Sequence, residues 1–167
     1  MADDDIHVKG LSQLQALLDT VAPKIERNIM RGALRAGANV IKPVAAANIH
    51  SVSGELAKGL RVTTRARGGT VTASLKAGGP HSFVAKWVEH GTRPHTITAR
   101  DGGALRFGGG FVKSVQHPGI VSPKPFLRPA LDSQASAAVI AVGEYIKNRL
   151  ATKEGLDTAD IVIEGDE

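Results

Sequence analysis

Histidine is the residue type in this sequence best suited to metal binding and to acid–base chemistry. The chain contains six histidines, and four of them lie in its glycine-rich middle: His81, His90, His95 and His117. His90 and His95 are five residues apart with Pro94 between them, which is neither the i, i+4 pair of a helical zinc site nor a His-Glu-x-x-His motif. Glu89 and Asp101 are near in sequence, but these ligands would have to converge from a loop. We therefore expect no metal site.

Other catalytic patterns are missing as well. No serine stands in a Gly-x-Ser-x-Gly motif, and the glycine runs at 102–103 and 108–110 are not followed by the Lys-Ser/Thr of a phosphate-binding loop. The carboxylates of the middle are too sparse to form an obvious acid–base pair. With no cysteine in 167 residues, thiol catalysis, disulfides and Cys-ligated zinc are excluded. The sequence therefore predicts a protein that is not an enzyme, with no catalytic residue and no cofactor.

Charge is distributed unevenly along the chain. Five basic residues and no acidic one occur from Lys58 to Lys76, whereas the segment from Glu154 onward carries six acids and no base. A predicted helical face carries four cations at spacings of three, four and four, namely Lys24, Arg27, Arg31 and Arg35. Such a stripe could face DNA or could be an ordinary solvated surface, and both interpretations stay open.

Length and composition predict one domain with a modest core. A chain of 167 residues is most simply a single domain. Aromatic residues make up only 4%, so the core must be built from Ala, Val, Leu and Ile. The apolar runs are too short to span a membrane, and the acidic first five residues are unlike a secretory signal. We therefore expect a soluble cytoplasmic protein.

The N-terminal part is predicted to be mostly helical. A short strand at 6–9 precedes an amphipathic helix over 11–21, which Ser12 could cap. Pro23 suits the first turn of a second, longer helix, and Pro43 should kink that helix before one or two further turns. The apolar stripe of the second helix comprises Ile25, Ile29, Ala33, Ala36, Val40 and Val44.

The middle of the chain changes to a strand pattern. Two runs that alternate apolar and polar residues, 60–64 and 70–75, flank Gly68-Gly69 and predict a β-hairpin. The segment 83–89 is too short to assign. Residues 90–125 are rich in loop residues, and we expect one small hairpin inside them, 105–107 paired with 111–115.

Helical periodicity returns after Pro125 and should end at Gly155. The predicted apolar stripe of this last helix comprises Leu127, Leu131, Ala135, Val139, Val142, Ile146 and Leu150. The fold class is therefore α+β, with long N-terminal and C-terminal helices packed on a small antiparallel β-sheet and a long Gly/Pro-rich loop or hairpin arm. We expect a single domain over 1–153, with the arm at about 90–125, and an acidic C-terminal tail over 154–167.

Three segments combine an apolar anchor, a charge and a Gly or Pro that fixes the backbone: 87–95, 117–119 and 123–131. Glu89 is a lone carboxylate beside Trp87, and an uncompensated carboxylate in apolar surroundings is costly. We therefore predict that Arg128 reaches Glu89 and pairs with it.

These segments also carry a resemblance. The sequence reads Val-Glu-His-Gly-Thr-Arg-Pro-His at 88–95, Ala-Leu-Arg-Phe at 104–107, His-Pro-Gly at 117–119 and Lys-Pro-Phe-Leu-Arg-Pro-Ala-Leu at 124–131. In this order and spacing the motifs resemble the tail-completion or head–tail connector (neck) proteins of tailed phages, related to those called minor tail protein Z-like. The similarity covers roughly 85–135. His90 stands where the family often has an aromatic residue, and the acidic tail has no counterpart.

The resemblance implies a structural virion part of the phage neck, present as a homo-oligomeric ring, expected to be a hexamer, around the DNA passage at the head-proximal end of the tail. Expected partners are tail terminator or tail tube proteins and head-side connector or adaptor proteins, with assembly in the host cytoplasm. The residues expected at subunit or partner interfaces are Trp87, Glu89, Gly91, Thr92, Arg93, Pro94, His95, Arg106, Phe107, His117, Pro118, Pro125, Phe126, Leu127 and Arg128. The stripe of Lys24, Arg27, Arg31 and Arg35 would face DNA.

A different class of function remains open beside the phage neck. The pI of about 9.7 also fits a small cytoplasmic protein that binds nucleic acid without sequence preference. Against this alternative, aromatic side chains for base stacking are nearly absent. Tight binding that weakens steeply with salt would favour it.

Overall fold

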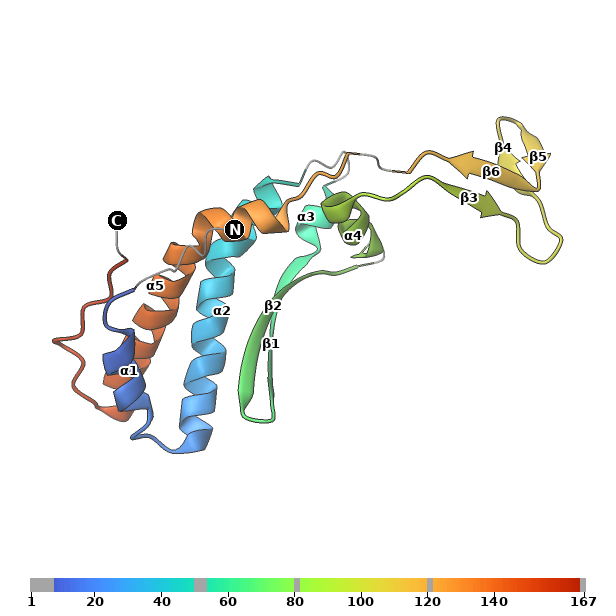
Figure 1. Cartoon of the computed structure of the whole chain (residues 1–167). Helices are drawn as coiled ribbons and strands as arrows, with labels where there is room; N and C mark the ends of the chain where they lie inside the picture. The colour runs from blue at the N-terminus through green and yellow to red at the C-terminus, as the bar shows by residue number, and fades with distance from the viewer. Residues whose placement is uncertain (1–7, 50–53, 80–81, 120–121, 166–167) are drawn as a thin grey trace.

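The structure is a computed structural model that describes residues 8–49, 54–79, 82–119 and 122–165. It has the predicted α+β class, with a helical body, a hairpin beside it and an arm that projects from one end (Figure 1). In chain order the elements are α1 (Leu11–Leu18), α2 (Pro23–Ala47), α3 (Glu55–Lys58), β1 (Leu60–Arg67), β2 (Thr70–Ala77), α4 (Ser82–His90), β3 (His95–Thr98), β4 (Leu105–Phe107), β5 (Gly110–Val112), β6 (Ser114–His117) and α5 (Leu127–Glu154).

The ends of the helices follow from their Pro and Gly residues. Helix α2 begins at Pro23 as predicted and continues past the exposed Pro43 for one further turn. Helix α5 ends before Gly155, whose φ of 66° is the left-handed conformation typical of a helix C-terminus. The predicted Ser12 cap is wrong, because α1 begins directly after Gly10, and the Gly10 carbonyl accepts the Leu14 N–H at 3.1 Å.

The body has two hydrophobic clusters. In the first, α1, α2 and α5 pack around Leu14, Ile29 and Leu150. The second lies where the end of α2, α3, the β1–β2 hairpin, α4 and the start of α5 meet, and Phe126 and Leu60 are buried in it. Helices α2 and α5 run antiparallel, and the hairpin lies against α2 on the side away from α5 (Figure 1). The second cluster therefore joins the hairpin to the long helices. It also joins to them the root of the arm, which is the place where α4 and the start of α5 meet.

The expected acidic tail is part of the body. Ile161 and Ile163 are buried in the first cluster, the Ile161 carbonyl accepts a hydrogen bond from Lys147 Nζ at 2.6 Å, and Val8 bridges to Gly165. The segment after the boundary predicted at 153–154 is therefore not a solvated tail, because Ile161 and Ile163, which lie among its acidic residues, are buried in the first cluster. Of the strand predicted at 6–9, Val8 forms this isolated bridge, and residues 6 and 7 lie outside the described ranges.

The apolar stripe predicted for the last helix is wrong at its first turns. Leu131 is 51% exposed, whereas Ala130, Ala138 and Gly143 are buried. Ala138 faces α2, which approaches α5 closely at Gly37, whereas Gly143 lies against Ile163 and Leu11. Periodicity of large side chains alone misses such a contact.

Replacing Gly37 by alanine should destabilise the protein by about 1–2 kcal/mol. A Cβ at this position would lie 2.8 Å from the Ala138 carbonyl oxygen and 2.8 Å from Val142 Cγ2, so the backbones of α2 and α5 would have to separate. The strain outweighs the gain of roughly 1 kcal/mol in helix propensity. Urea unfolding followed by circular dichroism measures the effect. Ala47→Gly at the exposed end of α2 is the control for propensity, and an increase in stability of Gly37→Ala would contradict the close approach.

The β1–β2 hairpin is confirmed, with Gly68 and Gly69 at positive φ in the turn. The arm is more regular than predicted. A hairpin occurs near the expected place, but its second strand β5 is Gly110–Val112 and not 111–115. Ser114 and Val115 belong to β6, which pairs with β3 in an antiparallel ribbon, Thr96 opposite Gln116 and Ile97 opposite Val115. Segment 83–89, left unassigned from sequence, belongs to α4. The arm is therefore a two-stranded ribbon with a hairpin at its far end.

Candidate interaction surfaces

Glu89 fastens the root of the arm to the body. Glu89 is on α4, and its carboxylate lies at the start of α5. The first backbone N–H groups of a helix lack an intrahelical acceptor. Glu89 Oε2 accepts the N–H of Phe126 at 2.8 Å and that of Leu127 at 2.9 Å, and Oε1 accepts the N–H of Arg128 at 3.1 Å. A side chain from a different helix thus caps α5.

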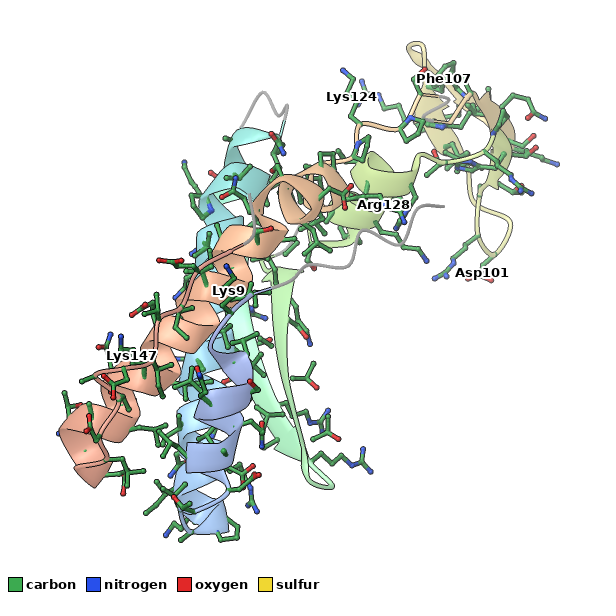
Figure 2. The ribbon with its side chains drawn as sticks, turned by 60° about the vertical axis from the view of Figure 1, so that its left-hand side comes forward. Lys9, Asp101, Phe107, Lys124, Arg128 and Lys147 are labelled. Atoms are coloured by element: carbon green, nitrogen blue, oxygen red, sulfur yellow. The ribbon has the colours of Figure 1, made fainter. Side chains whose placement is uncertain are left out.

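The predicted ion pair of Glu89 with Arg128 is wrong. Among the described residues, no salt bridge joins the two side chains, and the contact runs to the Arg128 backbone instead. The Arg128 side chain is exposed at the start of α5 beside α4 (Figure 2). The carboxylate is satisfied by the helix terminus, so it needs no guanidinium partner.

The same contact lowers the pKa of Glu89. Burial raises the pKa of this carboxyl, but the N–H groups of Leu127, Phe126 and Arg128, together with the charge of His90, outweigh that effect and hold the pKa below its ordinary value. The charged form is therefore favoured by folding, and the anchor depends on it.

Other bonds reinforce this junction. The Lys124 N–H donates to the Val88 carbonyl at 2.9 Å, and Asn48 Nδ2 donates to the Phe126 carbonyl at 3.4 Å. Phe126, one of the residues expected at an interface, is completely buried against its own chain. Glu89, Gly91, Thr92 and Leu127 are half-buried in the same junction. Within the subunit, Glu89, Phe126 and Leu127 connect the arm to the body.

The remaining expected interface residues are exposed. They are Trp87 on α4; Arg93 and Pro94 before β3; His95 in β3; Arg106 and Phe107 in β4; His117 and Pro118 at the end of β6; and Pro125 and Arg128 around the start of α5. Trp87, 45% exposed, meets Phe83 edge-to-face with ring centroids 5.0 Å apart. A pocket of about 560 Å³ at the arm root is lined by Trp87, Ile97 and the two ribbon histidines. An apolar surface is thus exposed where the arm leaves the body.

Two histidines of the arm form hydrogen bonds with its backbone. His95 and His117 are opposite each other in the β3–β6 ribbon, with ring centroids 5.0 Å apart. His95 Nδ1 donates to the Arg93 carbonyl at 2.9 Å, and His117 Nδ1 accepts the Gly119 N–H at 3.0 Å. Within the described residues, no group of three or more His, Asp or Glu could hold a metal ion. The ribbon histidines therefore have a structural explanation.

The far end of the arm exposes two aromatic side chains. Phe107 is 62% and Phe111 78% exposed, and both belong to the β4–β5 hairpin, at the greatest distance from the long helices (Figure 2). The sequence motifs include Phe107 among the expected interface residues but not Phe111. The signal was available, since a phenylalanine directly after three glycines has little of its own chain to pack against. Phe111 is opposite Arg106 and Phe107 is opposite Gly110, so the two rings lie on opposite faces of the hairpin, and each face offers one exposed aromatic side chain to a partner.

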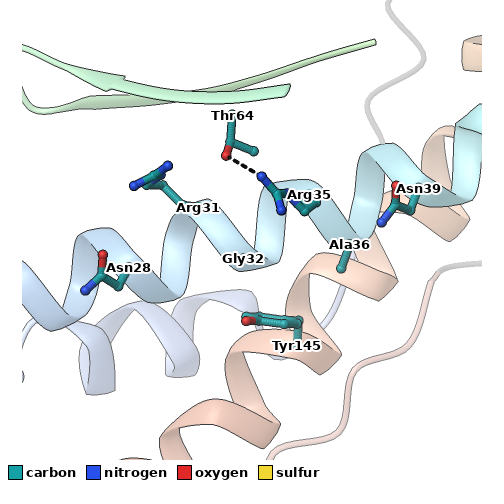
Figure 3. Close-up of a pocket in the computed structure, with 8 residues that line it drawn as sticks. All are labelled: Asn28, Arg31, Gly32, Arg35, Ala36, Asn39, Thr64 and Tyr145. Atoms are coloured by element: carbon teal, nitrogen blue, oxygen red, sulfur yellow. Dashed lines mark hydrogen bonds between the residues drawn. The ribbon is translucent and has the colours of Figure 1, made fainter. Parts of the chain in front are cut away.

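The four cations of the α2 stripe are all exposed, and two of them lie beside the β1–β2 hairpin. Lys24 and Arg27 are exposed near the start of the helix. Arg31 and Arg35 extend toward the β1–β2 hairpin, and Arg35 Nη2 donates to Thr64 Oγ1 at 3.4 Å (Figure 3). They line a pocket of about 360 Å³, with Tyr145 of α5 on the other side of α2. Arg35 of the predicted DNA-facing stripe therefore contacts the chain's own hairpin, while all four cations of the stripe remain exposed.

Comparisons with models of known protein families, with curated proteins and with solved structures find no match to this chain. The helices of the described residues include none that is long and apolar enough to cross a membrane. Function is therefore argued from the surfaces described above and from the motifs that carry the resemblance to phage neck proteins.

Proposed function

We propose that this chain is a structural protein of a tailed-phage virion. It forms a ring, expected to be a hexamer, that joins or completes the head-proximal end of the tail around the DNA passage. Its partners are tail terminator or tail tube proteins on one side and head-side connector or adaptor proteins on the other. The ring assembles in the host cytoplasm and has no enzymatic activity.

The observation that carries the proposal is the arm with its aromatic end. Phe107 and Phe111 are exposed at the far end of a ribbon, while the apolar surface around Trp87 is exposed at the root. A ring needs two different surfaces on each subunit, because each contact is made by the front of one copy and the back of the next. An arm that ends in two aromatic rings supports such a contact, since aromatic side chains contribute much of the energy of interfaces.

The anchor at Glu89 supports the same function. An arm that swings freely loses conformational freedom when it docks, and this loss weakens the contact. Here the arm root is held by the three N–H bonds to Glu89 and by the bond from Lys124 to Val88. A fixed arm root gives every subunit of a ring the same geometry.

Replacing both aromatic residues of the arm end, Phe107→Ser with Phe111→Ser, should prevent ring formation and leave the fold intact. Burying one such side chain contributes about 1.5–3 kcal/mol, so losing two should weaken subunit association by at least about 100-fold. Sedimentation velocity over a range of concentrations, alone and with the tail tube protein, measures the assembly.

Leu131→Ser is the matched control, because Leu131 is a similarly exposed apolar residue on α5. It should assemble like the natural sequence. Assembly by the double variant would overturn the role of the arm. A natural protein that stays monomeric with every neck and tail partner, and is missing from reconstructed particles, would overturn the proposal and favour the cytoplasmic nucleic-acid-binding alternative.

A further inference from the structure

We propose that the outward face of the β1–β2 hairpin contacts the phosphate backbone of double-stranded DNA. This inference rests on the proposed function, which brings DNA next to the protein, and it moves the expected DNA contact from the α2 stripe to the hairpin. The surface, called here the hairpin face, comprises Arg61, Thr63, Arg65, Arg67, Thr70, Thr72, Ser74 and Lys76.

The register of the hairpin defines this face. Successive residues of a strand point to opposite sides of the sheet. Thr64 accepts the hydrogen bond from Arg35 of α2, so the even-numbered residues of β1 and their partners point toward the helix. The odd-numbered residues of β1, with their partners Thr70, Thr72, Ser74 and Lys76, therefore point away from it. Among the described residues, no helix covers the hairpin face (Figure 1).

The hairpin face carries only one sign of charge. All eight side chains are cations or hydroxyls, and no carboxylate is among them. Arg61 and Lys76 are directly opposite each other, a pairing of like charges that destabilises a hairpin. In the described part of the chain, no salt bridge involves any of the four cations. A face kept only for solubility would mix the two signs, so this arrangement points to an anionic partner.

The residue types identify the anion. Arginine, lysine and the hydroxyls of serine and threonine are the side chains that contact phosphate oxygens in protein–DNA complexes. No aromatic side chain lies on the face, so bases of a single strand could not stack there. The face is a two-stranded sheet with strands of eight residues, about 26 Å at 3.3 Å per residue, which is long enough to follow several phosphates of a duplex. Contact should thus be independent of sequence and sensitive to salt.

The test compares two variants that remove equal charge from exposed sites. Arg65→Gln with Arg67→Gln removes two cations from the hairpin face, and Lys24→Gln with Arg27→Gln removes two from the α2 stripe, at the end that makes no contact with the hairpin in the described residues. Binding of a short fluorescent duplex is measured by anisotropy between about 50 and 200 mM salt. Circular dichroism and urea unfolding establish that both variants fold.

The hairpin variant should bind DNA about tenfold more weakly, and the slope of log K against log[salt] should fall by about 2, because each lost phosphate contact removes about 0.9. The α2 variant should bind within about twofold of the natural sequence. Equal losses in both variants, or a loss only in the α2 variant, would overturn the assignment. So would a hairpin variant that binds DNA normally but fails to assemble, which would identify an acidic protein surface as the partner.

This experiment separates the two proposals. DNA binding that depends on Arg65 and Arg67 in a protein that never forms rings would sustain the hairpin face and overturn the neck function. Rings that form normally from a protein without any DNA affinity would do the reverse.

Discussion

Phe126→Ala should destabilise the protein by about 4 kcal/mol, the range found when a fully buried phenylalanine leaves a cavity. Phe126 is completely buried, in contact with the cluster that includes Leu60 of β1 and Ala45 of α2. Removing its ring would loosen the hairpin, α4 and the start of α5 together. The arm root would then lose its support even where the first cluster remains folded.

Urea unfolding followed by two signals measures this effect. Trp87 is the only tryptophan and lies on α4, so its fluorescence reports on the second cluster, whereas circular dichroism reports on all helices. Phe111→Ala is the matched control, since it removes the same atoms from a side chain that is 78% exposed, and it should cost less than about 0.5 kcal/mol. Equal effects of the two substitutions would show that Phe126 does not hold this junction together.

The long helices and the hairpin could be predicted because their signals are local. Pro23 at the start of α2, Gly155 after α5 and Gly68-Gly69 between two alternating strands each lie within a few residues of the structure that they determine. The β3–β6 ribbon has no such signal, because Thr96 and Gln116 are brought together across the whole end of the arm. The burial of Ile161 was not predicted, because the acidic residues around it favoured a separate acidic tail.

The junction shows a different limit. The sequence pattern singled out Glu89, because a carboxylate next to Trp87 needs a partner. It then assigned that partner to the side chain of Arg128, whereas the partner is the backbone at the start of α5. Backbone N–H groups without an intrahelical acceptor occur at the N-terminus of every helix and do not depend on residue type. The side chains in the sequence therefore indicate that Glu89 has a partner, but not that this partner is a set of backbone N–H groups.

Glu89→Ala should cost about 2–3 kcal/mol, since it leaves three N–H groups of α5 without an acceptor and removes a charge from a helix N-terminus. Glu89→Gln should cost less, because one amide oxygen can still accept. Urea unfolding gives both values, and hydrogen exchange of the Phe126 and Leu127 amides should accelerate. Asp132→Asn removes an exposed carboxylate of α5 and should change the free energy of unfolding little.

The cost of Glu89→Gln should depend on pH in a direction fixed by the lowered pKa of Glu89. A carboxyl whose pKa is lower in the folded than in the unfolded state stabilises the protein fully above its unfolded pKa, and this contribution is lost as pH falls through the folded pKa. The stability difference between the natural protein and Glu89→Gln should therefore be constant near neutrality and shrink in acid. Asp132→Asn provides the baseline series. A difference that stays unchanged in acid would mean that the charge of Glu89 does not hold the arm root, and the fixed geometry invoked for the ring would need another source.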